Sequence, residues 1–557
     1  MEFSKGLKRV LLLELLIPML LLVLGVYLGL IQVLSRAGVI RGDSIWSLKY
    51  YEGLTLHGVV NAIVVTTFFA VAFGNAVMVY YLKNKIKMTW VWVSFWVMLI
   101  GTLLAAWAIL TGNATVLYTF YAPLKAHPLF YIGVALLVVG SWIAFFNWIP
   151  MYLRFRKEHP DKKTPIAVVG TLANFVIWFI ATVPVAYEVL VILLPWSLGY
   201  VTEINVMLTR VLFWFFGHPL VYFWLLPAYI MYYAFLPKLV GGKIYSDFAA
   251  RLVFFLFMIF SIPVGLHHQF AEPSINPNLK LLHAVFTFGV ALPSLITAFS
   301  VAASLEMGAH SRGYKGLMSW VYRQPYFDKN NYLVAYLIVG LLIFIVGGAT
   351  GVLNASYSMN NLVHNTGFLP GHFHLTVAGP VILAIFGMTI YMYSNLTGKE
   401  VKFKSLNVAV PYMWALGLTF FSSGLMVGGL LGEPRRTNLG ISYTNPDSPL
   451  FQSDWQITTA ITAIGGTIMF IAALSYFAVL IATMASKSKG AVAFNFPTSE
   501  VYHDEKNISF VKNFAPWILV AVVIILIAYV PTVKEALDNT AGGALPYLPT
   551  NPVPITP

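Results

Sequence analysis

Six histidines lie in or beside long apolar stretches of the chain, where burying an ionisable side chain is costly and calls for an explanation. They are His57, His218, His267, His268, His372 and His374. A single membrane histidine is usually a satisfied structural or interfacial residue. These six come from four separate stretches, and neutral imidazole is a common ligand of copper and heme iron. The pattern therefore favours metal or heme binding.

The spacing of these histidines divides them into sites. His372 and His374 are two residues apart and point about 200° apart on a helix, so they can bind two cofactors on opposite faces. His267 and His268 are adjacent and can converge on one ion with a third ligand such as His218. Tyr222, four residues after His218, shares its helical face, although an ordinary packed tyrosine explains it equally well. The geometry predicts two adjacent hemes and a histidine-bound metal.

The composition excludes a soluble protein. Hydrophobic residues make up 59% of the 557 residues and charged residues 10%, whereas soluble domains carry about 25% charged residues. The net charge of +13 does not indicate nucleic-acid binding, because the basic residues form short clusters between apolar runs. The chain has no cysteine. A thiolate-bound copper centre or an iron–sulfur cluster must therefore belong to a partner subunit.

The long apolar runs predict an all-α polytopic membrane bundle, since a helix of about 20 apolar residues crosses a bilayer. Thirteen spans are expected: Val10–Leu34, Leu56–Leu82, Trp90–Leu110, Leu129–Leu153, Ile166–Leu194, Val206–Leu236, Leu252–Phe270, Leu281–Leu305, Tyr332–Val352, Leu369–Tyr391, Val408–Leu431, Ile457–Ala485 and Phe514–Val530. We expect one membrane-embedded domain over residues 1–557 and, from the Pro-rich end, an extended tail over 532–557. Glu14 in the first span is expected to face protein.

The basic residues orient the bundle. Clusters such as Lys83, Lys85 and Lys87 occupy every second connection, and the connections after the fifth, seventh and ninth spans carry almost no Lys or Arg. The positive-inside rule then places the N-terminus in the cytoplasm and the C-terminus outside. Under this orientation all six histidines lie in the outer half of the membrane.

Four strings around these histidines identify a family. They are YEGLTLHGVVNA, WFFGHPLVYFWLLPAY, PVGLHHQFAEP and LPGHFHLTVAG. In these strings and their order the chain closely resembles subunit I of the heme–copper oxygen reductases, over nearly its whole length. The resemblance implies that His57 and His374 are the axial ligands of a low-spin heme and that His372 binds a high-spin heme. It implies one copper ion bound by His218, His267 and His268, with Tyr222 covalently joined to His218.

Within this family the chain looks like the B family, the ba-type cytochrome c oxidases. Leu220 stands where the A family has a glutamate, and the loop LKNKIK lacks the aspartate of the A-family proton channel. The B-family likeness implies low-spin heme b, a high-spin a-type heme and one main proton conduit. Hydroxyl-bearing residues stand where that conduit needs them, namely Tyr229, Tyr233, Ser294, Thr297 and Ser300. Serine and threonine in membrane helices often bond only to their own helix.

The resemblance also implies which residues contact the hemes on their outer side. Arg435 and Arg436, in LGEPRRT, match the pair that holds heme propionates, a role suited to guanidinium groups. His364 and Asn365 match the loop over the hemes. Many relatives have an acid a few residues earlier, where this chain has Asn360 and Asn361.

The implied function is that of the catalytic subunit of a terminal respiratory oxidase in a prokaryotic cell membrane, reducing O2 to water with coupled proton uptake and translocation. Electrons are expected from cytochrome c through a subunit II, which alone would hold a dinuclear copper centre. A small single-helix subunit and membrane lipids are further partners that the family allows; nucleic acid is not expected.

Three alternatives remain. A quinol-fed oxidase would share every feature above. A nitric oxide reductase has the same architecture with non-heme iron, but it typically carries a glutamate near the position of Tyr222, and Tyr222 and Leu220 argue against it. A transporter using its histidines for protons or metal ions would be colourless, so a visible spectrum separates it from an oxidase.

Overall fold

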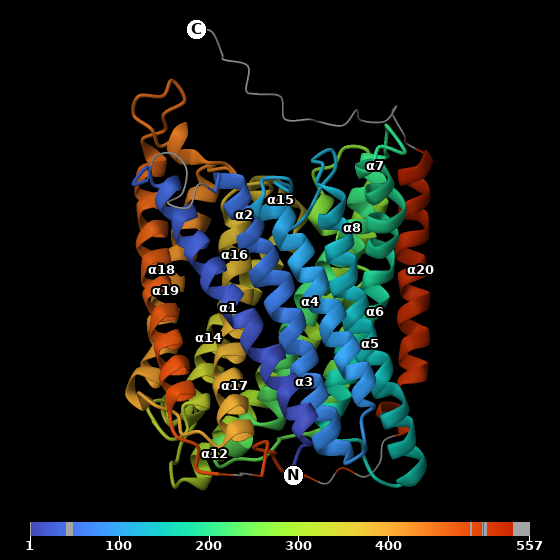
Figure 1. The fold of residues 1–557 in the computed structure, drawn as a ribbon, viewed down its shortest axis with the longest axis vertical. Helices are drawn as coiled ribbons and strands as arrows, with labels where there is room; N and C mark the ends of the chain where they lie inside the picture. The colour runs from blue at the N-terminus through green and yellow to red at the C-terminus, as the bar shows by residue number, and fades with distance from the viewer. Residues whose placement is uncertain (1, 41–47, 491–492, 504, 506–508, 539–557) are drawn as a thin grey trace.

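The fold is a bundle of helices that run side by side along the long axis of the molecule (Figure 1). The computed structural model describes residues 2–40, 48–490, 493–503, 505 and 509–538. Within these ranges the regular secondary structure is helical, and β-structure is limited to isolated bridges such as that between Ile244 and Val501. The expected all-α membrane bundle is confirmed.

The long helices form the frame. Their bounds are α1 (Lys5–Arg36), α3 (Val65–Leu82), α4 (Met88–Leu110), α5 (Pro128–Glu158), α6 (Ile166–Tyr187), α8 (Val206–Ala234), α10 (Asp247–Phe260), α11 (Pro277–Gly289), α12 (Ala291–Ser311), α14 (Leu333–Ala355), α16 (Phe368–Val377), α17 (Pro380–Thr397), α18 (Lys404–Leu430), α19 (Asp454–Ala485) and α20 (Phe514–Asp538).

Shorter segments join or extend these helices. They are α2 (Tyr50–Gly58), the π-helices η1 (Val59–Val64) and η2 (Glu188–Leu193), α7 (Leu194–Ser197), α9 (Leu236–Leu239), α13 (Ser319–Tyr322), α15 (Tyr357–Val363), and the 3-10 helices η3 (Gly265–Gln269), η4 (Leu439–Ile441) and η5 (Ser509–Val511). The π-helix η1 continues α2 into α3, so the second span is one helical segment, Tyr50–Leu82.

Twelve segments in the described part of the chain are long and apolar enough to cross a membrane. The thirteenth that we expected, Leu252–Phe270, is not one long helix. Its first part belongs to α10, which ends at Phe260, and the 3-10 helix η3 begins at Gly265. Pro263, in the string SIPVG, lacks a backbone N–H and disfavours helix at the preceding residue, so the helix stops before it. The expected orientation of the termini stays a prediction.

The first residues of the expected C-terminal tail are helical. Residues 532–538, the first part of the tail expected over 532–557, continue α20, and 539–557 lie outside the described residues. The sequence KEAL at 534–537 consists of good helix formers, which explains the extension.

The helix α8 is the core of the bundle, with nearly every residue from Leu208 to Ala234 buried. It contacts α6, α17, α20 and η3. Glu14 on α1 is 0% exposed and accepts a hydrogen bond from Asn75 Nδ2 at 3.4 Å, so it faces protein as expected. By contrast, α11 and α12 expose apolar side chains such as Leu281 and Leu295, as expected of a surface in contact with lipid or another subunit.

Candidate functional site

A cavity of about 720 Å³ opens inside the bundle. Its lining includes all six histidines of the sequence analysis, contributed by α2, α8, η3 and α16, together with Tyr222. Protein interiors normally hold few voids larger than a water molecule. A cavity of this size, lined by imidazoles, is therefore a site for bound cofactors.

His57 and His374 face each other across this cavity. Their ring centroids are 6.3 Å apart and the ring planes differ by 19°. His57 Nδ1 donates to Gly25 O and His374 Nδ1 donates to Pro370 O, each at 2.7 Å. Both Nε2 atoms are left free for a metal, and one ion bonded at about 2 Å to each ring fits between them. The pair fits the axial ligands of one heme.

Two glycines of α1, which we did not single out from the sequence, contact His57. A Cβ atom at Gly29 would lie 2.7 Å from His57 Cε1, so only glycine fits there. Gly25 supplies the carbonyl that holds the ring. The two glycines form a G-x-x-x-G pattern, GVYLG, which lets helices approach closely in membranes and could have indicated this contact.

His372 points in another direction, as its spacing from His374 predicted. Its Nδ1 lies 2.9 Å from Thr350 Oγ1 and 3.1 Å from Gly347 O, both on α14. The Thr350 hydroxyl donates to Gly347 O at 2.8 Å, so its oxygen can accept from His372. These contacts hold the ring and leave Nε2 free, as a single proximal ligand of heme iron requires.

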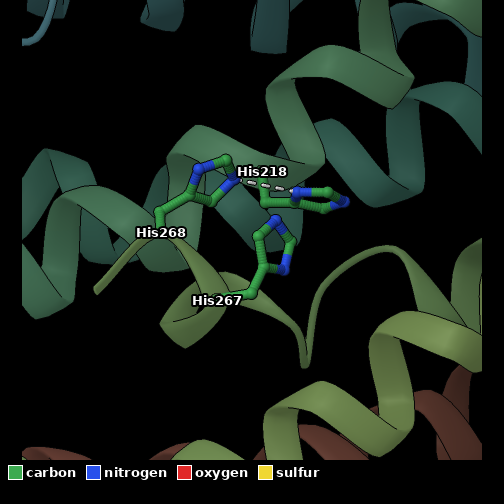
Figure 2. A group of neighbouring side chains, drawn as sticks. All are labelled: His218, His267 and His268. Atoms are coloured by element: carbon green, nitrogen blue, oxygen red, sulfur yellow. Dashed lines mark hydrogen bonds between the residues drawn. The ribbon is translucent and has the colours of Figure 1, made fainter. Parts of the chain in front are cut away.

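The remaining three histidines form a cluster, shown in Figure 2. The cluster consists of His218, His267 and His268. Each of these residues has one ring nitrogen that lies within 4.8 Å of a ring nitrogen of the other two. His218 Nδ1 and His268 Nε2 are 3.1 Å apart. The His268 ring stacks on Trp214 at 3.7 Å between centroids. An all-imidazole donor set suits copper among the metals that proteins bind, although zinc also accepts it.

Tyr222 lies beside this cluster on α8, as its spacing predicted. Its ring centroid is 4.9 Å from that of His218, with the planes 56° apart. His218 Nε2 is buried and has no hydrogen-bond partner among the residues that the structure describes. A buried polar nitrogen without a partner is costly, so another group is expected to satisfy it.

Arg435 and Arg436 line the cavity near His364. Burial and the charge of Arg436 lower the pKa of Arg435 to about 10. Burial and the neighbouring charges of Arg435 and Arg436 lower the pKa of His364 to about 4. Positive charge beside a cavity favours an anionic ligand, and heme propionates are carboxylates.

Asn365, which was expected beside the hemes, does not line the cavity. Its Oδ1 accepts a hydrogen bond from Arg435 Nη2 at 2.8 Å.

A buried ion pair that we did not predict holds the loop before these arginines. Arg36, at the end of α1, pairs with Glu433, whose side chain is 0% exposed. Arg36 Nη1 also donates to Thr437 O at 2.9 Å, and Thr458 Oγ1 donates to Glu433 Oε2 at 3.2 Å. The pair therefore fixes the loop on both sides of Arg435 and Arg436. The acidic Glu433 in LGEPRRT was visible in the sequence, but nothing in that string identifies Arg36 as its partner.

Replacing Arg36 with methionine is expected to lower the free energy of unfolding by about 3–5 kcal/mol, because the Glu433 carboxylate stays buried without its partner. The midpoint of heat-induced heme loss, measured in detergent, checks this. The double variant Arg36→Met, Glu433→Leu should regain much of the loss. A single variant as heat-stable as the wild type would contradict the account.

The hydroxyl residues of α8 and α12 meet as expected. Tyr229 Oη donates to Ser294 Oγ at 3.4 Å, and Tyr233 Oη donates to Thr297 Oγ1 at 3.0 Å. The cavity extends from the histidines to Tyr229, Ser294 and Thr297. Tyr233 and Ser300 are buried beyond its end. Four of the five residues are thus paired across one seam. The Ser300 side chain also interacts with Tyr233.

The chain is similar to known proteins over most of its length. A sequence profile described as cytochrome c and quinol oxidase polypeptide I matches residues 9–468. The chain is 39% identical to cytochrome c oxidase subunit 1 of Thermus thermophilus, over 88% of this chain and 87% of that protein. It is 25% identical to the probable quinol oxidase subunit 1 of Staphylococcus epidermidis, over 80% of this chain and 66% of that protein.

The architecture agrees with the sequence comparison. A solved structure described as a heme–copper terminal oxidase dimer matches with a TM-score of 0.96 and 48% identity, covering 99% of this chain and 97% of the other. The matched residues 9–468 include all six cavity histidines, Tyr222 and both arginines, whereas α20 lies beyond them. The chain belongs to the cytochrome c and quinol oxidase polypeptide I family, the subunit I family of the heme–copper oxidases.

Proposed function

We propose that this chain is the catalytic subunit of a terminal cytochrome c oxidase, a multi-pass protein of a prokaryotic cell membrane that reduces O2 to water. The observation that carries the proposal is the cluster of His218, His267 and His268, which shares one cavity with Tyr222 and His372. Family membership supports it. The whole chain, residues 1–557, acts as one membrane-embedded domain.

The positions of the histidines support the proposed cofactor sites, and the B-family likeness supports the heme types. His57 and His374 would hold a low-spin heme b, His372 a high-spin a-type heme, and the three-histidine cluster one copper ion. When bound, the hemes and copper supply electron transfer and the position where O2 is reduced. Arg435 and Arg436 would neutralise the propionates, with Asn365 holding Arg435 and His364 lying beside the pair.

Tyr222 would supply a proton and an electron to O2 and be joined to His218. The link is a bond between a ring carbon of Tyr222 and His218 Nε2, the nitrogen without a hydrogen-bond partner. Forming it would remove one hydrogen from each ring, and one O2 would take up both hydrogens with their electrons to become hydrogen peroxide. The bond would fix the phenol beside the cluster.

Protons would reach Tyr222 along the seam of α8 and α12. An apolar bundle offers no path for protons unless polar side chains and water line one. Hydroxyl groups both donate and accept, so Tyr233, Thr297, Tyr229 and Ser294 can pass protons through intervening water, with Ser300 next along α12. Each charge moved across the membrane is worth about 2.3 kcal/mol per 100 mV, which makes the reaction electrogenic.

Electrons would come from cytochrome c through a subunit II that carries a dinuclear copper centre. The B-family likeness and the 39% identity to the Thermus thermophilus protein support this assignment. A small single-helix subunit and lipids complete the expected partners. The quinol oxidase of Staphylococcus epidermidis is less similar, at 25% identity.

Oxygen consumption by the purified complex tests the proposed function. With reduced cytochrome c as donor, the complex should oxidise about four cytochromes for each O2 and release no peroxide. Reduction of nitric oxide without O2 consumption would overturn the proposal in favour of a nitric oxide reductase.

Reduced cytochrome c is expected to reduce this chain rapidly only when subunit II is present. The chain has no cysteine, so it cannot build a thiolate-bridged copper centre to accept the electron. Stopped-flow absorbance of the low-spin heme measures the rate with and without the partner. Equal rates would place the electron-accepting site on this chain. Rapid reduction by a quinol alone would indicate a quinol-fed oxidase.

A further inference from the structure

Helical hydrogen bonding is interrupted at the turn Ile262–Leu266, which lies directly before two of the three clustered histidines. A tyrosine of α20 bonds to both sides of this turn. The N–H of Gly265 donates to Tyr529 Oη at 3.1 Å, and Tyr529 Oη donates to Ile262 O at 3.2 Å. Tyr529 is 3% exposed. One buried hydroxyl therefore satisfies a backbone donor and a backbone acceptor on the two sides of Pro263, where helical hydrogen bonding is interrupted.

His283 on α11, a fully buried histidine, holds the next residue of the same turn. The N–H of Leu266 donates to His283 Nδ1 at 3.4 Å, and His283 Nε2 donates to Ala528 O on α20 at 3.2 Å. Its ring meets that of Tyr529 edge-on, with centroids 4.9 Å apart. Because Nδ1 accepts and Nε2 donates, the imidazole is neutral, and it ties the turn to α20.

The network reaches His267 through Thr287, one helical turn after His283. Thr287 Oγ1 donates to His283 O at 2.6 Å, so its oxygen is free to accept from His267 Nδ1, which lies 3.0 Å away. This bond puts the His267 proton on Nδ1 and leaves the Nε2 lone pair for a metal. The tautomer of a cluster histidine is thus set by the helix that carries His283.

The turn has no room to shift against its neighbours. A Cβ atom at Gly265 would lie 2.2 Å from Trp214 O on α8 and 2.4 Å from Tyr529 Oη. The turn is therefore pressed between α8, which carries His218, and α20, which carries Tyr529. Its position relative to His218 depends on the hydroxyl and imidazole behind it.

We propose that Tyr529 and His283 are positioning residues of the copper site. They fix the backbone of Ile262–Leu266, so that His267 and His268 converge on His218 and the cluster binds copper tightly. Helix α20, which lies beyond the residues matched by the family profile, would then be part of the metal site through this contact. The inference rests on the proposed copper site.

The test is the copper affinity of the purified complex carrying Tyr529→Phe. The complex is incubated under reducing conditions with increasing concentrations of a copper(I) chelator, and the copper retained per heme is measured. Loss of an outer partner of a metal ligand typically costs 10–100-fold in affinity, so the chelator concentration that removes half of the cluster copper should fall by about that factor. His283→Leu should have the same effect, with the heme content of both variants unchanged.

Tyr476→Phe is the matched control. Tyr476 is also buried, at 0% exposed, and its hydroxyl lies 3.9 Å from Met19 Sδ. It should release copper at the wild-type chelator concentration. Wild-type copper retention in both Tyr529→Phe and His283→Leu would overturn the positioning role, and so would parallel loss of hemes and copper. A wild-type complex with no histidine-bound copper would instead overturn the proposed function.

Discussion

Replacing His374 with alanine is expected to remove the low-spin heme and to lower the heme content by about half. His374 and His57 face each other, and their free Nε2 atoms could bind one heme iron from opposite sides. A heme iron that loses one of these two ligands is no longer six-coordinate. His57→Ala should give the same result. Pyridine-hemochrome analysis and the reduced-minus-oxidised spectrum measure both effects.

His310→Ala is the control, since that histidine is half-exposed on α12 and pairs with Glu306. It should keep both heme signals. If His57→Ala and His374→Ala both retained a six-coordinate low-spin spectrum with the protein inserted in the membrane, the assignment of this pair would be wrong.

Thr297→Val is expected to slow turnover about 100-fold, the lower end of what a positioned proton-transfer group contributes. Thr297 lines the cavity, and its hydroxyl accepts a hydrogen bond from Tyr233. Valine keeps the shape of the side chain but removes the hydroxyl that would pass the proton. Oxygen consumption at saturating donor measures the effect. Heme spectra and copper content should stay normal, because Thr297 contacts no ligand histidine in the described hydrogen-bond network.

Two further variants separate proton delivery from packing. Thr297→Ser keeps a hydroxyl and should restore most of the turnover. Thr419→Val makes the same chemical change on an exposed face of α18 and should have no effect. Wild-type turnover in Thr297→Val would mean that protons reach the site elsewhere, and the B-family conduit would be wrong for this chain.

Much of the arrangement of the site was predictable because several of its residues lie at helical intervals. The spacing of His372 and His374 on α16, and of His218 and Tyr222 on α8, determined which faces they occupy. That hydroxyls of α8 and α12 meet was also predictable, since both helices carry them at helical intervals. The ligand roles themselves came from the family resemblance, because spacing alone left several metals open.

The contact between Arg36 and Glu433 was not predictable from periodicity. Arg36 and Glu433 are 397 residues apart, and nothing in either local pattern indicates the other. The end of α10 at Phe260 also differs from expectation, because continuous hydrophobicity predicts a span whether or not Pro263 interrupts it. His283 is a different case: it sits in an apolar span, and the reasoning that singled out the other six histidines applies to it.

The central claim, two hemes beside a copper held by three histidines, is tested most directly by metal analysis of the purified complex and of its His267→Ala variant. The account predicts that all iron is heme iron and that the variant loses one copper per chain, whatever copper subunit II contributes, while keeping both hemes. Iron beyond the heme content, with no copper lost in His267→Ala, would contradict it.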